Sequence, residues 1–178
     1  MITLTAQQIY DIFIHRKDVY SVQQSNGAYF PTKLPIVPSI IQHHIDGKIT
    51  IGAYCLNTDN TVKWACVDID SEEPDSRRLL EEAQIVYDQF PDFPRMLEFS
   101  GRKGYHIWIF FWPPEQANYA QRLVKSRLNR VNMNRYEVFP KQTELNEGRK
   151  YGNLVKLPMA THRVSGRKSQ ILKMEGVL

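Results

Sequence analysis

The sequence is poor in cysteine, with only Cys55 and Cys66 among its 178 residues. Both lie in hydrophobic segments of the chain, where a buried reduced thiol is more common than a disulfide. A zinc knuckle built from cysteines is excluded by this count. We therefore expect two free cysteines inside the protein.

Long hydrophobic runs, internal repeats and low-complexity segments are also missing. No apolar run approaches the roughly 20 residues of a membrane-spanning helix, and residues 1–5 lack the charged start and long apolar core of a signal peptide. We therefore expect a cytoplasmic protein with no membrane partner. Hydrophobic residues make up 42% of the chain and charged residues 24%, which is typical of one globular domain of this length.

The chain has no large excess of one charge, since it contains 23 lysines and arginines and 19 aspartates and glutamates. A net charge of +4 permits nucleic-acid binding without requiring it. The charges are nevertheless unevenly distributed. Segments 122–135 and 149–173 are basic and segment 68–92 is acidic, as expected if cations follow a nucleic-acid strand and acids hold a metal. Solvated helix faces are the alternative interpretation of the basic residues in 125–130.

Helical periodicity and capping residues predict the helices. A capping box at 5–8 begins a helix of about ten residues, and Ser39 can cap a short one that ends before Gly47. Prolines favour the first turn of a helix, so Pro74 and Pro113 each indicate a start. The predicted helices span about ten residues from Thr5, then 39–45, 74–90 and 113–129.

Apolar segments between turn residues predict the strands, at 19–24, 28–30, 49–56, 62–70, 95–99, 105–112, 136–139 and 153–157. The first six form three hairpins, and Asn26-Gly27 is a strong hairpin turn. Prolines 31, 35 and 38 predict a loop after the first hairpin. Neighbouring strands interrupted by two long helices indicate an α+β domain with a mainly antiparallel sheet and flanking helices.

The segment WACVDID, residues 64–70, is an apolar strand that ends in two acids. Side chains alternate along a strand, so Asp68 and Asp70 point the same way, about 6 to 7 Å apart. Such carboxylates repel unless a hard cation lies between them, and Mg²⁺ or Mn²⁺ is the usual occupant of an all-oxygen site. The alternative is that the two acids merely cap the strand and precede the next helix.

A second segment, SGRKGYH at residues 100–106, places two glycines and two cations in one tight loop. Glycines let the backbone approach a ligand closely, and such a loop suits the capture of phosphate oxygens. In a regular four-residue loop, Ser100 would pair with Tyr105 and His106 would point to the opposite face. Both can serve one site only if the loop is bulged or irregular, which we predict.

Four motifs occur in order along the chain: DID at 68–70, SGRKGYH at 100–106, EVFPKQ at 137–142 and KLPMATH at 156–162. Together they resemble the archaeo-eukaryotic primase superfamily, most closely primase-polymerases of mobile-element conflict and CRISPR-associated systems. The resemblance covers about residues 13–167. It implies one domain, 1–178, with a catalytic core related to RNA-recognition folds. In it, residues 49–178 hold the metal and nucleotide site, and residues 1–48 form a small N-terminal part packed on the catalytic sheet.

The resemblance also implies roles for single residues. It implies that Asp68, Asp70 and Glu137 bind Mg²⁺ or Mn²⁺ and act in catalysis, since two metal ions need about three carboxylates. Glu144 and Glu147 match no motif and are alternatives for the third acid. The residues implied in nucleotide binding are Ser100, Arg102, Lys103, His106, Lys156, His162 and Arg163.

The implied activity is template-directed nucleotidyl transfer, with single-stranded DNA template, primer and nucleoside triphosphates as partners. The chain is short for this superfamily, so we expect further domains or CRISPR or replication proteins to act with it. A metal-dependent nuclease and a non-catalytic nucleic-acid-binding module remain alternatives. Trp64, Trp108 and Trp112 are expected in the core, and His15, His43 and His44 are expected to be structural. Tyr29, Tyr54 and Tyr151 are candidates for stacking on a base if exposed.

Overall fold

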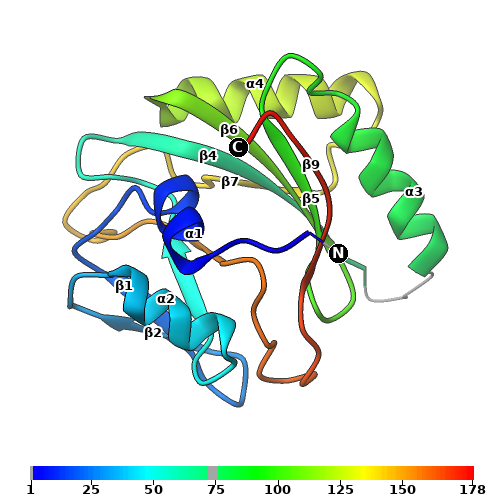
Figure 1. Cartoon of the computed structure of the whole chain (residues 1–178). Coiled ribbons are helices and arrows are strands. Elements are labelled where there is room, and N and C mark those ends of the chain that lie inside the picture. The colour runs from blue at the N-terminus through cyan, green and yellow to red at the C-terminus, as the bar shows by residue number, and fades with distance from the viewer. Residues whose placement is uncertain (1, 72–75) are drawn as a thin grey trace.

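The computed structural model describes residues 2–71 and 76–178. Within them the chain folds into two antiparallel sheets with flanking helices (Figure 1), which confirms the α+β class. The helices are α1 (Ala6–Phe13), α2 (Pro38–Ile45), α3 (Ser76–Tyr87) and α4 (Ala117–Arg130). The strands are β1 (Tyr20–Gln23), β2 (Tyr29–Thr32), β3 (Ile51–Tyr54), β4 (Thr61–Ile69), β5 (Arg95–Phe99), β6 (Tyr105–Gln116), β7 (Glu137–Phe139), β8 (Leu154–Lys156) and β9 (Gln170–Glu175).

The larger sheet has five strands in the order β7-β4-β6-β5-β9. Helices α3 and α4 cover one of its faces, as Figure 1 shows. Alternation along β4 sends Ala65, Val67 and Ile69 to this face, where they are fully buried against the two helices. Apolar residues that recur every second position in the strands therefore pack against apolar residues that recur every three to four positions in the helices, and together they form one buried layer.

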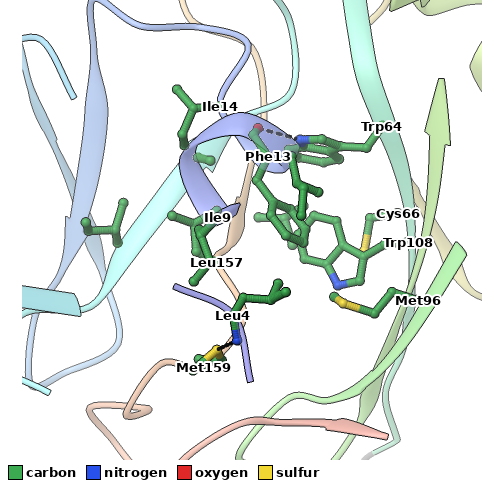
Figure 2. Close-up of a cluster of buried hydrophobic side chains, with 14 of the residues drawn as sticks. Leu4, Ile9, Phe13, Ile14, Trp64, Cys66, Met96, Trp108, Leu157 and Met159 are labelled. Carbon is green, nitrogen blue, oxygen red and sulfur yellow. Dashed lines mark hydrogen bonds between the residues drawn. The ribbon is translucent and has the colours of Figure 1, made fainter. Parts of the chain in front are cut away.

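The other face of this sheet packs against α1, α2 and the smaller sheet, whose order is β2-β1-β3-β8. Figure 2 shows this second core. In it the Phe13 and Trp108 rings pack edge to face, with their centroids 4.9 Å apart. The Trp64 indole donates a hydrogen bond to the Phe13 carbonyl, at 2.8 Å. Cys55 and Cys66 are buried free thiols, as predicted. This second core fixes the two sheets against one another.

Several local predictions are confirmed. The capping box of α1 is complete, because the Thr5 hydroxyl accepts from the Gln8 amide and the Gln8 side chain accepts from the Thr5 amide. Strands β1 and β2 form the hairpin expected around Asn26-Gly27, with Gly27 at a φ of 89°. Within the described part of the chain, no helix has the length and apolar character needed to cross a membrane.

Strands β3 and β4 do not form the predicted hairpin. The turn between them is present, with the Asn57 amide donating to the Thr61 carbonyl at 3.0 Å. Beyond it, however, β3 pairs with β1 and β8 while β4 pairs with β6 and β7. Both strands are largely buried, so long-range packing decides their partners, and the turn carries the chain from one sheet to the other.

Two predictions that rest on prolines are also wrong. Pro113 and Pro114 lie in β6, not in a helix, because Gln116 and Glu115 still pair with Thr61 and Val62. The prolines fall where the register with β4 shifts, so their missing N–H groups break no regular ladder. Pro31 lies within β2, an edge strand that tolerates it, rather than in a loop.

Two further predictions differ from the structure, and one strand was not predicted. Helix α2 begins at Pro38 after Val37 and has no side-chain cap, so Ser39 is not its cap. Trp112 is 45% exposed instead of lying in the core. Strand β9 was not predicted, since only Ile171 among its six residues is buried and the segment carries little apolar pattern. The predicted start of the third helix at Pro74 lies outside the described residues.

Candidate nucleotide and metal site

One row of charged side chains crosses the larger sheet. Glu137 on β7 lies opposite Asp68 on β4, Asp68 lies opposite His106 on β6, and His106 lies opposite Glu98 on β5. Residues directly opposite one another in antiparallel strands point to the same face. All four side chains therefore lie on the face toward the smaller sheet, because Cys66 and Trp108 of the same strands are in that core.

The acids at the end of β4 crowd together. Asp70 is two residues beyond Asp68 and shares its face. Burial raises the pKa of Asp68, the negative charges of Asp70 and Glu137 raise it further, and His106 opposes them. A carboxylate in such surroundings is stabilised by a proton or by a cation.

These acids match a hard cation in donor chemistry, since Asp68, Asp70 and Glu137 offer only carboxylate oxygens. In this structure lysines lie beside two of them. The Lys141 ammonium lies 2.7 Å from Glu137, and the Lys103 ammonium lies 3.8 Å from Asp70. Among the described residues, no group of three or more potential ligands is already assembled for a metal ion. The donor set fits Mg²⁺ or Mn²⁺.

The loop between β5 and β6 has the irregularity that was predicted. Ser100 donates its amide to the Gly104 carbonyl at 2.9 Å, so the loop has three residues and the register places Ser100 opposite Gly104. Ser100 and His106 consequently share one face. Gly101 adopts a φ of 88°, a conformation that favours glycine. A Cβ on Gly104 would lie 2.3 Å from the Ile69 carbonyl oxygen, so only glycine lets this loop approach the end of β4.

A cavity of about 230 Å³ opens between the two sheets at this point. Its lining combines acids at the end of β4 with serine, histidine and basic side chains from other segments, and Lys103 and His106 each lie 3.8 Å from one of these acids. The predicted site residues that line it are Asp68, Asp70, Ser100, Arg102, Lys103, His106, Lys156 and His162. Lys156 comes from β8 of the smaller sheet. Both sheets are thus required to form the cavity.

Two predicted residues do not line this cavity. Glu137 stands at the outer end of the charged row, on the strand beside Asp68. Arg163 is turned toward the N-terminal region, where its guanidinium donates to the Gly47 carbonyl at 2.9 Å and its amide donates to Gln23 at 3.1 Å. The structure places Arg163 next to the predicted site rather than in it.

The basic residues that line the cavity affect the protonation of His162. Burial lowers the pKa of His162, and the positive charges of Lys156, Arg102 and His106 lower it further. Its Nδ1 accepts from the amides of Val164 and Ser165, both at 3.3 Å. A neutral His162 therefore carries its proton on Nε2 and can donate from that atom.

Sequence reasoning missed two polar residues of this region. Gln23 from β1 lines the cavity beside Tyr29. Glu98 is fully buried beneath it and contacts His106, Trp108 and Lys156. The one available signal was a carboxylate within the largely buried strand 95–99, since a buried carboxylate needs a partner.

Comparisons with known proteins identify the family of this chain and a similar fold. The family model for the archaeo-eukaryotic primase domain of the TOTE conflict system matches residues 5–176. The solved structure of the archaeo-eukaryotic primase domain of the primase-polymerase from cyanophage S-2L is similar, with a TM-score of 0.57. That match has 12% sequence identity and covers 90% of this chain and 82% of the phage domain, so it supports the fold alone. A comparison with curated protein sequences gives no match.

The family match spans nearly all of the chain and includes the charged row, the β5–β6 loop and the cavity between the sheets. It also agrees with the resemblance carried by the four sequence motifs. This chain belongs to the archaeo-eukaryotic primase family, as a primase domain of the type found in TOTE conflict systems.

Proposed function

We propose that this domain is a template-directed nucleotidyltransferase, a DNA primase-polymerase that joins nucleoside triphosphates on a single-stranded DNA template. The observation that carries the proposal is the cavity between the sheets, which is lined both by Asp68 and Asp70 from the end of β4 and by cationic or hydroxyl donors from the β5–β6 loop, β6, β8 and the segment after β8. Nucleotidyl transfer needs both kinds of group, because carboxylates can hold divalent metal ions while cations and hydroxyls hold the triphosphate.

The cationic side of the cavity is suited to the triphosphate. Arg102 can bind phosphate oxygens through two N–H groups, and Lys103 supplies a point charge. Ser100 and His106 reach the same space from β5 and β6, and His162 faces them from the loop after β8. Arg163 stays a predicted contributor that would have to leave Gly47.

The acidic side is suited to divalent cations, with Asp68, Asp70 and Glu137 as proposed ligands of Mg²⁺ or Mn²⁺. When bound, these ions stabilise the charge that develops on the attacking and leaving oxygens of phosphoryl transfer. The chain's own contribution is to hold the carboxylates on two neighbouring strands, where the pairing of Asp68 with Glu137 fixes their positions. Further domains, or CRISPR or replication proteins, remain proposed partners.

Incubation with a single-stranded DNA template, labelled nucleotides and Mg²⁺ or Mn²⁺, with and without primer, tests this function. Incorporation should fall by roughly 100-fold or more in Asp70→Ala, because a group that acts on developing charge is lost. Asp88→Ala is the matched control, since Asp88 follows α3 on the other face of the sheet and interacts with Gln84. It should retain full activity.

The outcomes separate the possible functions. Products without primer indicate a primase, and products only with primer indicate a polymerase domain. Degradation of the DNA in the absence of nucleotides would instead indicate a nuclease. Failure of the wild-type chain to bind nucleotide or divalent metal would contradict the proposal and support a non-catalytic binding module.

A further inference from the structure

Glu98 is the most deeply buried carboxylate of this region. It lies on β5 between Leu97 and Phe99, and none of its side chain is exposed. It does not line the cavity, so a nucleotide placed there would not touch it. Burial alone would raise the pKa of Glu98, but Lys156 and His106 outweigh burial and lower it to about 2. Glu98 is therefore a buried negative charge.

One oxygen of Glu98 fixes the ring of His106. Glu98 Oε2 lies 3.0 Å from His106 Nδ1 and 3.0 Å from Trp108 Nε1. An ionised carboxylate can only accept hydrogen bonds, so Nδ1 of His106 is the donor. The other ring nitrogen, Nε2, is left on the cavity side, 3.8 Å from Asp68. The orientation of the imidazole thus depends on Glu98.

The second oxygen of Glu98 faces the other sheet. Glu98 Oε1 lies 3.7 Å from the ammonium nitrogen of Lys156, whose side chain is 6% exposed. Neither atom has a hydrogen-bond partner among the described residues. Burial lowers the pKa of the Lys156 amine, and Glu98 opposes that effect. A buried ammonium without a nearby anion would be strongly destabilising.

We propose that Glu98 is a positioning residue, which holds His106 and Lys156 at the cavity wall so that they can act on the phosphates of the incoming nucleotide. The proposal rests on the proposed function, because it assumes that the cavity binds a triphosphate. One carboxylate joins a donor from each sheet, through β6 on one side and β8 on the other. Its Oε2 accepts from His106, and its negative charge stabilises the buried ammonium of Lys156.

The variant Glu98→Gln tests the charge with little change of shape. An amide can still accept from His106 or Trp108 through its oxygen, but its NH₂ group would then face Lys156 as a second donor. We expect the KM for nucleotides to rise by roughly 10-fold or more, with a smaller change in kcat, because contacts to bound phosphates are weakened. An unchanged KM in an otherwise active protein would overturn the proposal.

Glu175→Gln is the matched control. Glu175 lies on β9 of the same sheet, pairs with Arg95 at 2.6 Å and has a side chain that is 57% exposed. The change removes the same charge without touching the cavity. Kinetic constants should stay at wild-type values in this variant. A loss equal to that of Glu98→Gln would overturn the proposal, since any lost carboxylate in the sheet would then have the same effect.

A measurement without nucleotide separates failure of this inference from failure of the proposed function. In ¹⁵N-labelled protein, the His106 Nδ1–H resonance should lie downfield because a carboxylate accepts its hydrogen bond, and it is assigned by its loss in His106→Gln. In Glu98→Gln it should move upfield or disappear. A resonance that does not change would overturn the inference, whether or not the wild-type chain incorporates nucleotides.

A double-mutant cycle covers the case in which Glu98→Gln folds poorly. Removing one partner of a buried ion pair costs more than removing both. Urea unfolding should therefore show a smaller loss of stability for Glu98→Gln in a Lys156→Met background than in the wild type. Equal losses in the two backgrounds would show that Glu98 does not act on Lys156 and would overturn the proposal.

Discussion

At the scale of single residues, the surroundings of each histidine decide its role. His106 and His162 line the cavity, whereas His44 is fully buried away from it. The His44 Nδ1 accepts from the Ile51 amide at 2.9 Å, so its Nε2–H donates to the Pro158 carbonyl at 3.0 Å. His44 thus ties α2 to β3 and to the segment after β8 in its neutral form, which agrees with the predicted structural role.

This arrangement predicts a pH dependence of stability. Burial lowers the pKa of His44 from 6.5 to about 4. Between pH 6.5 and 4, His44 is protonated in the unfolded chain but neutral in the folded chain. The contribution of His44 to the free energy of unfolding is therefore fully present above pH 6.5 and falls as the pH is lowered toward 4. His44 should account for a loss of roughly 3 kcal/mol over this interval.

Urea unfolding at a series of pH values from 7 to 4 measures the effect. The free energy of unfolding should depend less on pH in His44→Gln than in the wild-type chain. His43→Gln is the control, because His43 is the exposed neighbour on the same helix. Identical pH dependence in the wild type and His44→Gln would contradict the assignment.

The residues of the site differed in how far they could be predicted. Asp68 and Asp70 follow from period-two alternation at the end of an apolar strand, and the structure places both on one face of the cavity. The role of Glu98 could not be predicted, because it depends on the register with His106 and on Lys156 from another sheet. Trp112 was predicted to lie in the core but is exposed, because composition does not show where strand β6 extends beyond the core.

At the scale of elements, close contact between the β5–β6 loop and the end of β4 shapes the site. Gly104 has no side chain to separate its backbone from Ile69, and the Ser100 amide bonds to its carbonyl. This contact brings the β5–β6 loop beside Asp70. Local sequence signals predicted both segments, but they could not predict that β3 and β4 join different sheets.

Gly104→Ala should therefore damage both stability and activity. A methyl group 2.3 Å from the Ile69 oxygen forces the loop or the end of β4 to move, at a cost of about 1–3 kcal/mol. Nucleotide incorporation should fall because Ser100 and Asp70 separate. Urea unfolding and the incorporation assay measure the two effects.

Gly148→Ala is the control for this prediction. Its Cβ would approach only the Asn146 side chain, at 3.6 Å. The free energy of unfolding should change by less than about 0.5 kcal/mol, as for most exposed positions. If Gly104→Ala matched this control in both measurements, the close contact would not matter for the site.

At the scale of the whole molecule, the cavity depends on how the two sheets are packed. The larger sheet supplies the acids, Ser100 and His106, and the smaller sheet supplies Lys156 and Gln23. The core shown in Figure 2 holds the sheets together through α1 and the tryptophans of β4 and β6. Strand patterns predicted the α+β class, but the division into two sheets arises from packing between distant segments.

The central claim is that divalent metal binds at the acidic side of this cavity together with a nucleoside triphosphate. The most direct measurement is paramagnetic broadening by Mn²⁺ in ¹⁵N-labelled protein containing a non-hydrolysable nucleoside triphosphate. We predict the strongest broadening at the amides of residues 68–70, 100–104 and 137, and its loss in Asp70→Ala. Broadening confined to acids elsewhere, such as Glu81 and Asp88, would contradict the account.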